Sequence, residues 1–295
     1  MKSKYDVVII GSGLGGLVSA NILARHGYSV CVLEKNKQYG GNLQTFVRDK
    51  NIFDTGVHYI GSLGEGENLH QYFSYLGVMK DLKLAKLDND NLEVSSNGYD
   101  ISYLNSKISD YLDTITANKK LKAVLAGSNF LYAGNKNTPL YVHALSINSY
   151  IKSSWRCVDG GSQITRSLMK RVKEFGGEVY NKQEVIGFDF VDNVLDSVKT
   201  KSGKKIKADY FISNIEPKLT IKMLDGKGMR KSYINRINQI KSMISAFSIY
   251  IVFKPKTFKY INHNYYHFKN HQDVWNTQDY SESTWPESYM LSMGV

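Results

Sequence analysis

Three glycines and one glutamate near the N-terminus have the residue types and the spacing of a dinucleotide-binding site. Gly11, Gly13 and Gly16 lie in the segment GSGLGG, and Glu34 follows 18 residues after Gly16. In this pattern the first glycine allows a tight turn, the second lets backbone approach a pyrophosphate, and the third lets a helix pack close to a strand. The free N–H groups at the start of that helix bind phosphate. Glu34 would accept hydrogen bonds from a ribose diol and repel a 2′-phosphate, which favours FAD or NAD over NADP.

The residues around this motif have the strand–turn–helix–strand order that such a site requires. Tyr5–Ile10 is a continuous apolar run, as expected for a buried parallel strand. Apolar residues then recur at helical spacing as far as Gly27, and Ser29–Leu33 is a second apolar run. The pattern therefore predicts a β-α-β unit. The alternative is a glycine-rich turn in some other α/β unit.

Composition indicates a globular protein of one or two domains. The chain has 295 residues and 42% hydrophobic residues, which is enough for a large buried core. No stretch approaches the ~20 apolar residues of a membrane span, and the N-terminal apolar run does not have the pattern of a signal peptide. We therefore expect a cytoplasmic location.

No metal site is predicted. The two cysteines, Cys31 and Cys157, have no metal-ligand spacing. His263, His267 and His271 recur every four residues, but no Cys, Asp or Glu completes a tetrahedral set. We interpret this segment as a polar surface.

The positive charge is concentrated in one part of the sequence. Residues 201–260 contain 14 Lys/Arg and 3 Asp/Glu, whereas the rest of the chain is balanced at 24 against 24. One interpretation is a solvated, lysine-rich face. The other is peripheral contact with a membrane through anionic lipid. No nucleic-acid partner is predicted, because no reader motif accompanies the charge.

The remaining elements are predicted from periodicity and turn residues. Residues 64–150 are mostly polar and helical, with a turn at Asn97-Gly98. A helix begins with Ser162 as its N-cap and ends at Gly176-Gly177. A later helical stretch and several strands are also expected: a helix over Ile221–Ile244, and strands at Glu178–Tyr180, Val185–Phe190, Val194–Thr200, Lys204–Lys207, Tyr210–Ser213 and Phe247–Phe253.

Several segments occur together in the order of a known family. After the glycine turn and Glu34 come Gly40-Gly41, FDTGVHYIG (53–61), the Gly160-Gly161 helix, GGEV (176–179) and ADYFISN (208–214). The chain resembles the phytoene desaturase, carotenoid isomerase and retinol saturase group of flavoproteins. The FDTGVHYIG segment is most similar to the retinol saturase and carotenoid isomerase branch. The resemblance covers nearly the whole chain and is most specific at 5–61.

This resemblance implies an α/β fold with two parts. A Rossmann-like FAD-binding domain with a small β-meander would comprise 1–61 and 151–216. A discontinuous α+β substrate domain with an apolar tunnel would comprise 62–150 and 217–295. The FAD-binding domain would be discontinuous as well, and the substrate domain would be incomplete at its C-terminus.

The resemblance also implies FAD as the cofactor, ahead of NAD, and a set of residues that hold it. The glycine turn would hold the pyrophosphate and Glu34 the adenosine ribose. Gly40-Gly41 would run beside the cofactor, and the backbone of Val185 would meet the adenine end. The cofactor-binding residues are then Gly11, Ser12, Gly13, Leu14, Gly15, Gly16, Glu34, Lys35, Gly40, Gly41, Asn42 and Val185.

The implied reaction is saturation, desaturation or isomerisation of C=C bonds in a carotenoid- or retinoid-like polyene. Such chemistry needs a dry tunnel more than a charged triad, and no Ser-His-Asp or paired-carboxylate set is evident. The residues expected nearest the flavin are His58 and Tyr59, either of which could donate a proton. Alternatively, His58 is a hydrogen-bonded residue that braces the turn at Gly56.

Two further functional hypotheses stay open. One is a flavin amine oxidase-like enzyme, against which the FDTGVHYIG segment argues. The other is a non-catalytic relative that binds a lipid or a prenylated partner. The family closes its FAD site with a C-terminal glycine-rich segment that has no match before Val295, so we expect a truncated product or a complementing chain.

Overall fold

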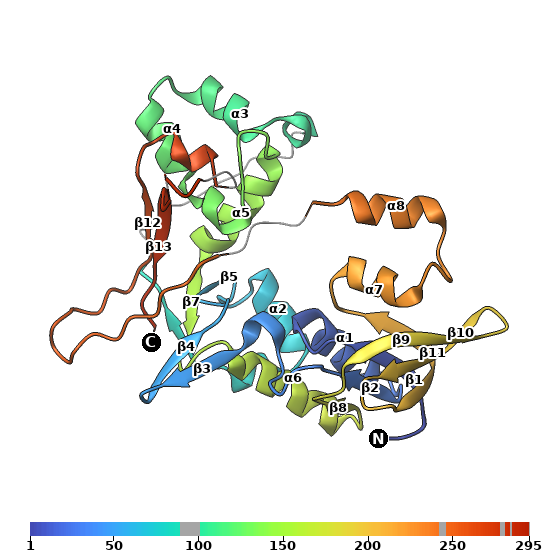
Figure 1. Ribbon diagram of the computed structural model, residues 1–295. Coiled ribbons are helices and arrows are strands. Elements are labelled where there is room, and N and C mark those ends of the chain that lie inside the picture. Colours follow the sequence, from blue (N-terminus) through green and yellow to red (C-terminus); the bar gives the residue numbers. More distant parts are fainter. Residues whose placement is uncertain (89–100, 242–245, 278–280, 284, 295) are drawn as a thin grey trace.

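The computed structural model describes the chain except for residues 89–100, 242–245, 278–280, 284 and 295 (Figure 1). Its central element is a six-stranded sheet in the order β8-β2-β1-β11-β10-β9. The strands are β1 (Lys4–Ile10), β2 (Val30–Leu33), β8 (Glu178–Tyr180), β9 (Val185–Val191), β10 (Val194–Thr200) and β11 (Lys205–Ser213).

The pairing directions divide this sheet into two parts. β8, β2, β1 and β11 run parallel to one another, while β9, β10 and β11 form an antiparallel meander. Turns at Asp192-Asn193, both at positive φ, and at Gly203 connect the meander strands. The expected α/β fold with a parallel sheet and a small β-meander is confirmed.

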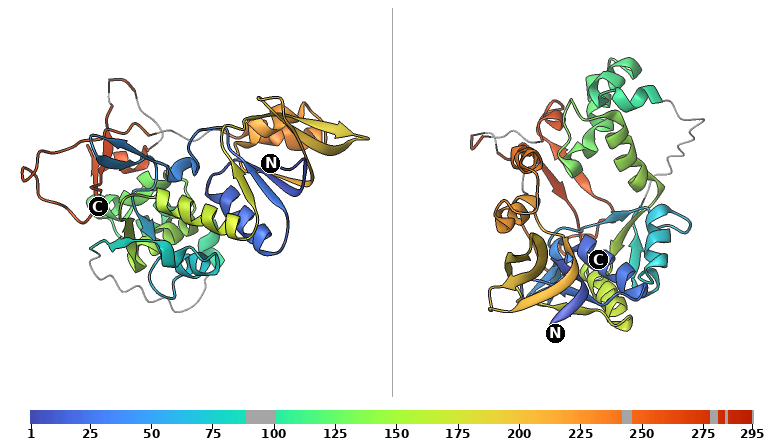
Figure 2. Two further views of the ribbon diagram at one scale, coloured as in Figure 1. Left: turned by 90° about the horizontal axis from the view of Figure 1, so that it is seen from below. Right: turned by 90° about the vertical axis from the view of Figure 1, so that its right-hand side faces the viewer.

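The apolar run of β1 serves both faces of the sheet because alternate side chains point to opposite sides. Val7 and Ile9 pack into a core with α1 (Leu14–Arg25) and α6 (Ser162–Glu174). Val8 and Ile10 pack into a second core on the other face, which includes Met223 of α7 (Pro217–Leu224). Figure 2 (left) shows α1 and α6 side by side. Burial on both faces explains why the run is continuous.

The rest of the chain forms helices and three small sheets. In Figure 1, α3, α4 and α5 gather in a part separate from the six-stranded sheet. The helices are α2 (Asn68–Tyr75), α3 (Ile108–Ile115), α4 (Lys119–Leu125), α5 (Leu140–Lys152) and α8 (Lys231–Gln239), with short 3₁₀ turns at Gly41–Leu43, Met79–Asp81, Ile101–Asn105, Gly127–Tyr132 and Asp273–Trp275.

The small sheets join segments that are distant in the sequence. The strands are β3 (Thr45–Arg48) with β4 (Asn51–Asp54), β12 (Tyr265–Phe268) with β13 (Ser288–Leu291), and β5 (Ile60–Gly61), β7 (Ser154–Cys157) and β6 (Leu84–Lys86) in the order β5-β7-β6. The last of these joins strands from both predicted domains. The domain boundaries given above stay a prediction.

Two strands that were predicted separately form a single strand, β11. Lys204–Lys207 and Tyr210–Ser213 were expected to be separate, but β11 runs without a break over Lys205–Ser213. Its N-terminal part pairs with β10 and the strand pairs with β1 from Lys207 to Ser213. Because both neighbours bond to the same strand, Ala208 and Asp209 continue it.

The predicted helix over Ile221–Ile244 is wrong in extent. The chain forms α7 and α8 instead, and the two are separated by residues in the left-handed region. Asp225, Gly226 and Gly228 have φ values of 50°, 74° and 70°, which a continuous α-helix does not permit. The stretch 242–245 and the predicted turn at Asn97-Gly98 lie outside the described residues.

The predicted strand at Phe247–Phe253 is also wrong. The described residues offer this segment no hydrogen-bonded strand neighbour, and every residue from 246 to 260 is exposed. An apolar, β-branched run is typical of a strand, but a strand forms only where another strand pairs with it.

The N-cap of α6 differs by one residue from the prediction. Gly161 occupies the cap position and Ser162 is the first helical residue. The Ser162 hydroxyl instead accepts hydrogen bonds from Thr45 Oγ1 (3.1 Å) and Arg166 (2.9 Å). It thereby connects α6 to β3 rather than capping its own helix.

Substitution of Gly16 tests the close packing of α1 against the glycine turn. A Cβ at position 16 would lie 2.1 Å from the carbonyl oxygen of Gly11, so Gly16→Ala must push α1 away from the turn. We expect a loss of about 3 kcal/mol or more in the free energy of unfolding, measured by urea denaturation. The control is Gly187→Ala in β9, where a Cβ meets nothing within 4 Å. Equal stability of the two variants would contradict this packing.

Candidate dinucleotide site

The glycine turn lies between β1 and α1 and leaves the start of the helix open. Gly11 has φ of 98°, in the left-handed region that favours glycine. Gly13 occupies the N-cap position of α1, where no side chain caps the helix. Leu14 and Gly15 of the first turn are exposed. The first N–H groups of α1 and the positive end of its dipole therefore face a place that suits a phosphate.

Glu34 holds this turn in place. Its buried carboxylate accepts hydrogen bonds at Oε2 from the Ser12 amide (3.0 Å) and the Ser12 hydroxyl (2.6 Å). At Oε1 it accepts one from the amide of Asn36 (2.9 Å). A carboxylate has about four lone-pair sites, so Oε1 retains one that a ribose hydroxyl could use. Glu34 thus has a structural task in addition to the predicted ribose contact, which stays a prediction.

Gly40 and Gly41 complete the cradle. The Gly40 amide donates to the Ser12 hydroxyl (3.2 Å), so the second glycine pair is tied to the same serine as Glu34. Both glycines have positive φ, and a Cβ at Gly41 would lie 3.3 Å from the Gly13 Cα. The two glycine backbones therefore approach each other with no side chain between them.

Asn214 is a site residue that the sequence did not reveal. It follows β11, and its amide donates to the Ile10 carbonyl (2.8 Å). Its side chain lies against the turn, because added Cβ atoms at Gly13, Gly15 and Gly16 would each lie within 3.2 Å of it. The ADYFISN segment was noted as a family feature, but no local pattern indicates that its last residue packs on a turn 200 residues earlier.

The other predicted cofactor residues differ in how exposed they are. Lys35 and Asn42 are exposed. Val185 is buried at the start of β9 and packs in the same core cluster as Leu33. The Gln183 amide donates to the Glu34 carbonyl (2.8 Å), which brings the chain before Val185 next to the end of β2. Ser12, the glycine turn and Gly40-Gly41 lie together, whereas Lys35 and Asn42 are exposed.

These residues fit a dinucleotide. The start of α1 is uncapped, Glu34 retains an acceptor site, and Cβ atoms would obstruct the turn. In addition, the buried Thr165 hydroxyl has no hydrogen-bond partner among the described residues and lies 2.3 Å from where a Gly40 Cβ would be. A pyrophosphate at α1 and a ribose at Glu34 would satisfy this set of donors and acceptors.

His58 lies in a partly buried polar environment. Burial lowers its pKa, the nearby Asp54 carboxylate raises it, and the Arg156 guanidinium lowers it further. Burial in turn raises the pKa of Asp54, although its Oδ1 accepts a hydrogen bond from the Gly161 amide (2.7 Å). The pKa of His58 is lowered overall, so a smaller fraction of it carries the second ring proton that it would donate.

Tyr59 points into a different environment from His58. Its hydroxyl is hydrogen-bonded to that of Tyr266, and its ring centroid is 4.9 Å from that of Tyr150. Burial raises the pKa of Tyr59, so it keeps its proton. The structure therefore does not bring His58 and Tyr59 to one point, and a proton-donating role for either stays a prediction.

Arg156 in β7 is the second residue that the sequence did not reveal. It is 2% exposed, and the described residues provide no carboxylate for an ion pair. Its guanidinium donates instead to neutral oxygens, including the Tyr260 hydroxyl (2.9 Å) and Asn264 Oδ1 (2.7 Å). Arg156 thereby fastens the 260–264 segment onto the β5-β7-β6 sheet.

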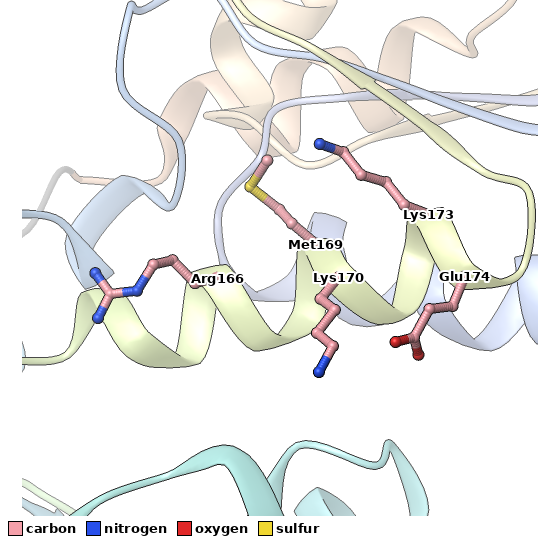
Figure 3. A pocket seen from close by; sticks show the side chains of 5 residues that line it. All are labelled: Arg166, Met169, Lys170, Lys173 and Glu174. Carbon is pink, nitrogen blue, oxygen red and sulfur yellow. The ribbon is translucent and has the colours of Figure 1, made fainter.

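An open hollow of about 600 Å³ lies along the outside of α6 (Figure 3). It is lined by Arg166, Met169, Lys170, Lys173 and Glu174, none of which is a predicted cofactor residue. In Figure 3 the Arg166, Lys170 and Lys173 side chains point in different directions rather than toward one point. We do not assign this hollow to the cofactor.

The described residues hold no candidate metal site and no candidate membrane span. Among them, no group of three or more His, Cys, Asp or Glu side chains could hold a metal ion. Likewise, none of the helices in the described ranges has the length and hydrophobicity to cross a membrane.

Comparisons with known proteins show what the chain is similar to. Residues 9–76 match the NAD(P)-binding Rossmann-like domain family. All-trans-retinol 13,14-reductase from Homo sapiens is 54% identical over 63 residues, which cover 21% of this chain and 10% of that protein. 4,4′-diapolycopene oxygenase from Methylomonas sp is 23% identical over 71% of this chain and 55% of its own length. Prolycopene isomerase 1 from an Oncidium hybrid cultivar is 43% identical over 23% of this chain and 11% of its own length.

The resemblance to the retinol saturase and carotenoid isomerase group is confirmed. The chain matches between 10% and 55% of the length of these relatives, and they are oxidoreductases and isomerases by name. The family model that matches residues 9–76 covers the glycine turn and Glu34.

Solved structures show the same fold. A Pyrococcus furiosus protein superposes with a TM-score of 0.64 at 21% identity, over 80% of this chain and 66% of the other. An oxidoreductase from Methanosarcina mazei has a TM-score of 0.63 at 16% identity, over 81% and 65%. A putrescine oxidase has a TM-score of 0.56 at 14% identity, over 78% and 62%. The expected Rossmann-like fold is confirmed.

The Glu34 carboxylate is the residue to test in this site. Glu34→Ala should weaken FAD binding by about 1–3 kcal/mol, because the ribose and Ser12 both lose an acceptor. The measurement is a fluorescence titration with FAD.

Ser12→Ala separates the two tasks of Glu34. This variant removes the hydroxyl that bonds Glu34 and Gly40 but keeps the carboxylate, so it should cost less affinity than Glu34→Ala. An unchanged dissociation constant in Glu34→Ala would refute the ribose assignment. Equal losses in both variants would mean that Glu34 acts only through the turn.

Proposed function

We propose that this chain is an FAD-dependent oxidoreductase that saturates, desaturates or isomerises C=C bonds in a hydrophobic polyene. Two observations together carry the proposal. Glu34 is hydrogen-bonded to the glycine turn, and the chain is 54% identical to a retinol reductase over 63 residues. The names of the other relatives add diapolycopene and prolycopene as related polyenes. FAD is favoured over NAD because the whole resemblance is to flavoproteins.

The residues of this chain have the task of binding and orienting the cofactor. The first turn of α1 would hold the pyrophosphate, Glu34 the ribose and the Gly40-Gly41 backbone the adjoining part of the cofactor. The FAD itself would supply the electron or hydride transfer. Residues 62–150 and 217–295 would hold the substrate and exclude water.

The surroundings of His58 and Tyr59 restrict their roles in this proposal. Burial lowers the pKa of His58, which disfavours the imidazolium, so the residue would serve as a hydrogen-bond partner more readily than as a proton donor. Burial raises the pKa of Tyr59, so it keeps its proton, and its hydroxyl is hydrogen-bonded to that of Tyr266. Tyr59, Tyr150 and Tyr266 form an aromatic cluster that suits an apolar chain better than a charged substrate.

Two other functions remain as alternatives. The fold of putrescine oxidase is similar, which accords with an amine oxidase-like activity, although the FDTGVHYIG segment favours the polyene branch. A non-catalytic, lipid- or prenyl-binding protein is the second, since a Plasmodium falciparum Rab GDI shares the fold at 14% identity with a TM-score of 0.53, over 72% of this chain and 66% of that one. Bound flavin would distinguish either enzyme from the non-catalytic binding protein.

The test begins with the purified chain. We expect a visible flavin absorption spectrum near one FAD per chain, with FAD identified by mass spectrometry after release. A polyene such as retinol or a lycopene isomer should then be converted, whereas putrescine should not. A colourless protein that also ignores added FAD would contradict the proposed enzyme, and a complementing chain that restores flavin binding would be the next partner to seek.

A further inference from the structure

The hydroxyls of Tyr59 and Tyr266 form a pair that holds one more proton than the pair itself can use. The two groups are hydrogen-bonded to each other, so one proton lies between them. Burial raises the pKa of both tyrosines, which therefore keep both protons at neutral pH. Among the described residues, no second acceptor lies within hydrogen-bond distance of either hydroxyl. One hydroxyl proton is consequently left for an acceptor outside the pair.

Asn264 is the nearest polar side chain that acts on this pair, and it acts as a donor. Its Oδ1 accepts a hydrogen bond from the Arg156 guanidinium (2.7 Å). Against the larger effect of burial, hydrogen bonding from Tyr59 and Asn264 lowers the pKa of Tyr266, which is the effect of donors on a hydroxyl oxygen. Asn264 therefore faces Tyr266 with its NH₂ group and does not take up the remaining proton.

Arg156 fixes Asn264 from the interior of the protein. Its side chain is 2% exposed, and its Nε has no acceptor among the described residues. Its two Nη atoms donate to oxygens of one short segment: the Tyr260 hydroxyl (2.9 Å), the Ile261 carbonyl (3.3 Å), the His263 carbonyl (3.4 Å) and Asn264 Oδ1 (2.7 Å). The residues that lead up to Tyr266 are thus held by a single cation.

The charge of that cation favours an electron-rich group nearby. The described residues give Arg156 no carboxylate as a counter-ion, and a charge in a buried place is screened less than one in water. An oxygen atom close to the tyrosine pair would be stabilised by this field, whereas a hydrocarbon would gain nothing from it.

The pair lies where three elements meet. Tyr59 directly precedes β5, Tyr266 lies in β12, and Tyr150 of α5 packs on Tyr59 with ring centroids 4.9 Å apart. Figure 1 shows the end of α5 next to β5 and β7. All three tyrosines are half-buried rather than enclosed. Their rings offer an apolar surface, and the paired hydroxyls give it one polar point.

We propose that the Tyr59–Tyr266 pair donates its remaining proton in a hydrogen bond to an oxygen atom of the ligand, and that Arg156 orients the pair through Asn264. Arg156 is then a positioning residue. The inference rests on the proposed polyene ligand and deepens it: the ligand is an apolar polyene that carries an acceptor oxygen rather than a pure hydrocarbon. A site built around a donor disfavours a ligand that leaves this donor unpaired.

The test compares two neutral polyenes that differ in one atom. Retinyl methyl ether has an oxygen that accepts but cannot donate, and its isostere has a CH₂ group in place of that oxygen. Their dissociation constants are measured by equilibrium dialysis against the purified 295-residue chain with FAD present. The double variant Tyr59→Phe/Tyr266→Phe removes both hydroxyls and keeps both rings. It should weaken binding of the ether about tenfold relative to that of the isostere.

The role of Arg156 is tested with the same pair of ligands. Arg156→Gln should weaken binding of the ether at least twofold relative to the isostere, because the hydroxyls are present but no longer oriented. A purely structural loss would weaken both ligands alike. Asn264→Ala breaks the same connection and should give the same result, so the test stands even if Arg156→Gln does not fold.

A matched control removes two hydroxyls from another tyrosine pair. The rings of Tyr103 and Tyr111 are in contact, with centroids 5.4 Å apart. Tyr103→Phe/Tyr111→Phe should leave the ratio of the two dissociation constants unchanged. Near-UV circular dichroism of every variant checks that the fold is kept.

Three results would overturn the proposal. Equal losses for ether and isostere in the double phenylalanine variant would refute the donated hydrogen bond. An unchanged ratio in both Arg156→Gln and Asn264→Ala would refute the positioning role. A chain that binds neither polyene would refute this inference and the proposed polyene substrate together, whereas a chain that binds both polyenes without the expected change in ratio would refute this inference alone.

Discussion

The candidate site depends on the hydrogen bonds that the Glu34 carboxylate accepts from Ser12. Through the amide and hydroxyl of this serine, the end of β2 is fastened to the turn between β1 and α1. The same hydroxyl accepts the Gly40 amide, so the second glycine pair belongs to the same network. The shape of the cradle therefore follows from one buried acid. A buried carboxylate is costly unless it is well hydrogen-bonded, and here three donors satisfy it.

The core of the sheet puts this network where a ligand can reach it. The residues of β1 alternate between two buried clusters, which fixes the strand and hence the direction in which Gly11 leaves it. Close contact between Gly16 and the Gly11 carbonyl then sets where α1 begins. No side chain caps the start of that helix, so its first N–H groups are available to an anion. Packing in the core and the proposed phosphate binding at the surface depend on the same short segment.

Much of this arrangement could be predicted because it is local. The glycine spacing, the apolar runs and Glu34 all fall within 30 residues, and each has a direct physical meaning. The meander strands were likewise marked by their turns at Asp192-Asn193 and Gly203. Asn214 and Arg156 could not be found in this way, because their contacts are to residues far away in the sequence.

The wrong predictions have a common cause as well. Phe247–Phe253 has the composition of a strand, yet pairing is a property of two segments and the described residues supply only one. The helix expected over Ile221–Ile244 failed at Asp225, whose left-handed conformation is not indicated by apolar periodicity. At Ser162 the prediction missed by one residue, since Gly161 takes the cap and the serine bonds across to Thr45.

The central claim is that Glu34 and the start of α1 recognise an adenosine ribose and a pyrophosphate. Isothermal titration of the purified chain with ADP-ribose and with its 2′-phosphorylated form tests this without reference to the flavin ring or the substrate. The account predicts that ADP-ribose binds at least tenfold more tightly, because the 2′-phosphate would meet the Glu34 carboxylate. Equal affinities, or tighter binding of the phosphorylated form, would contradict it.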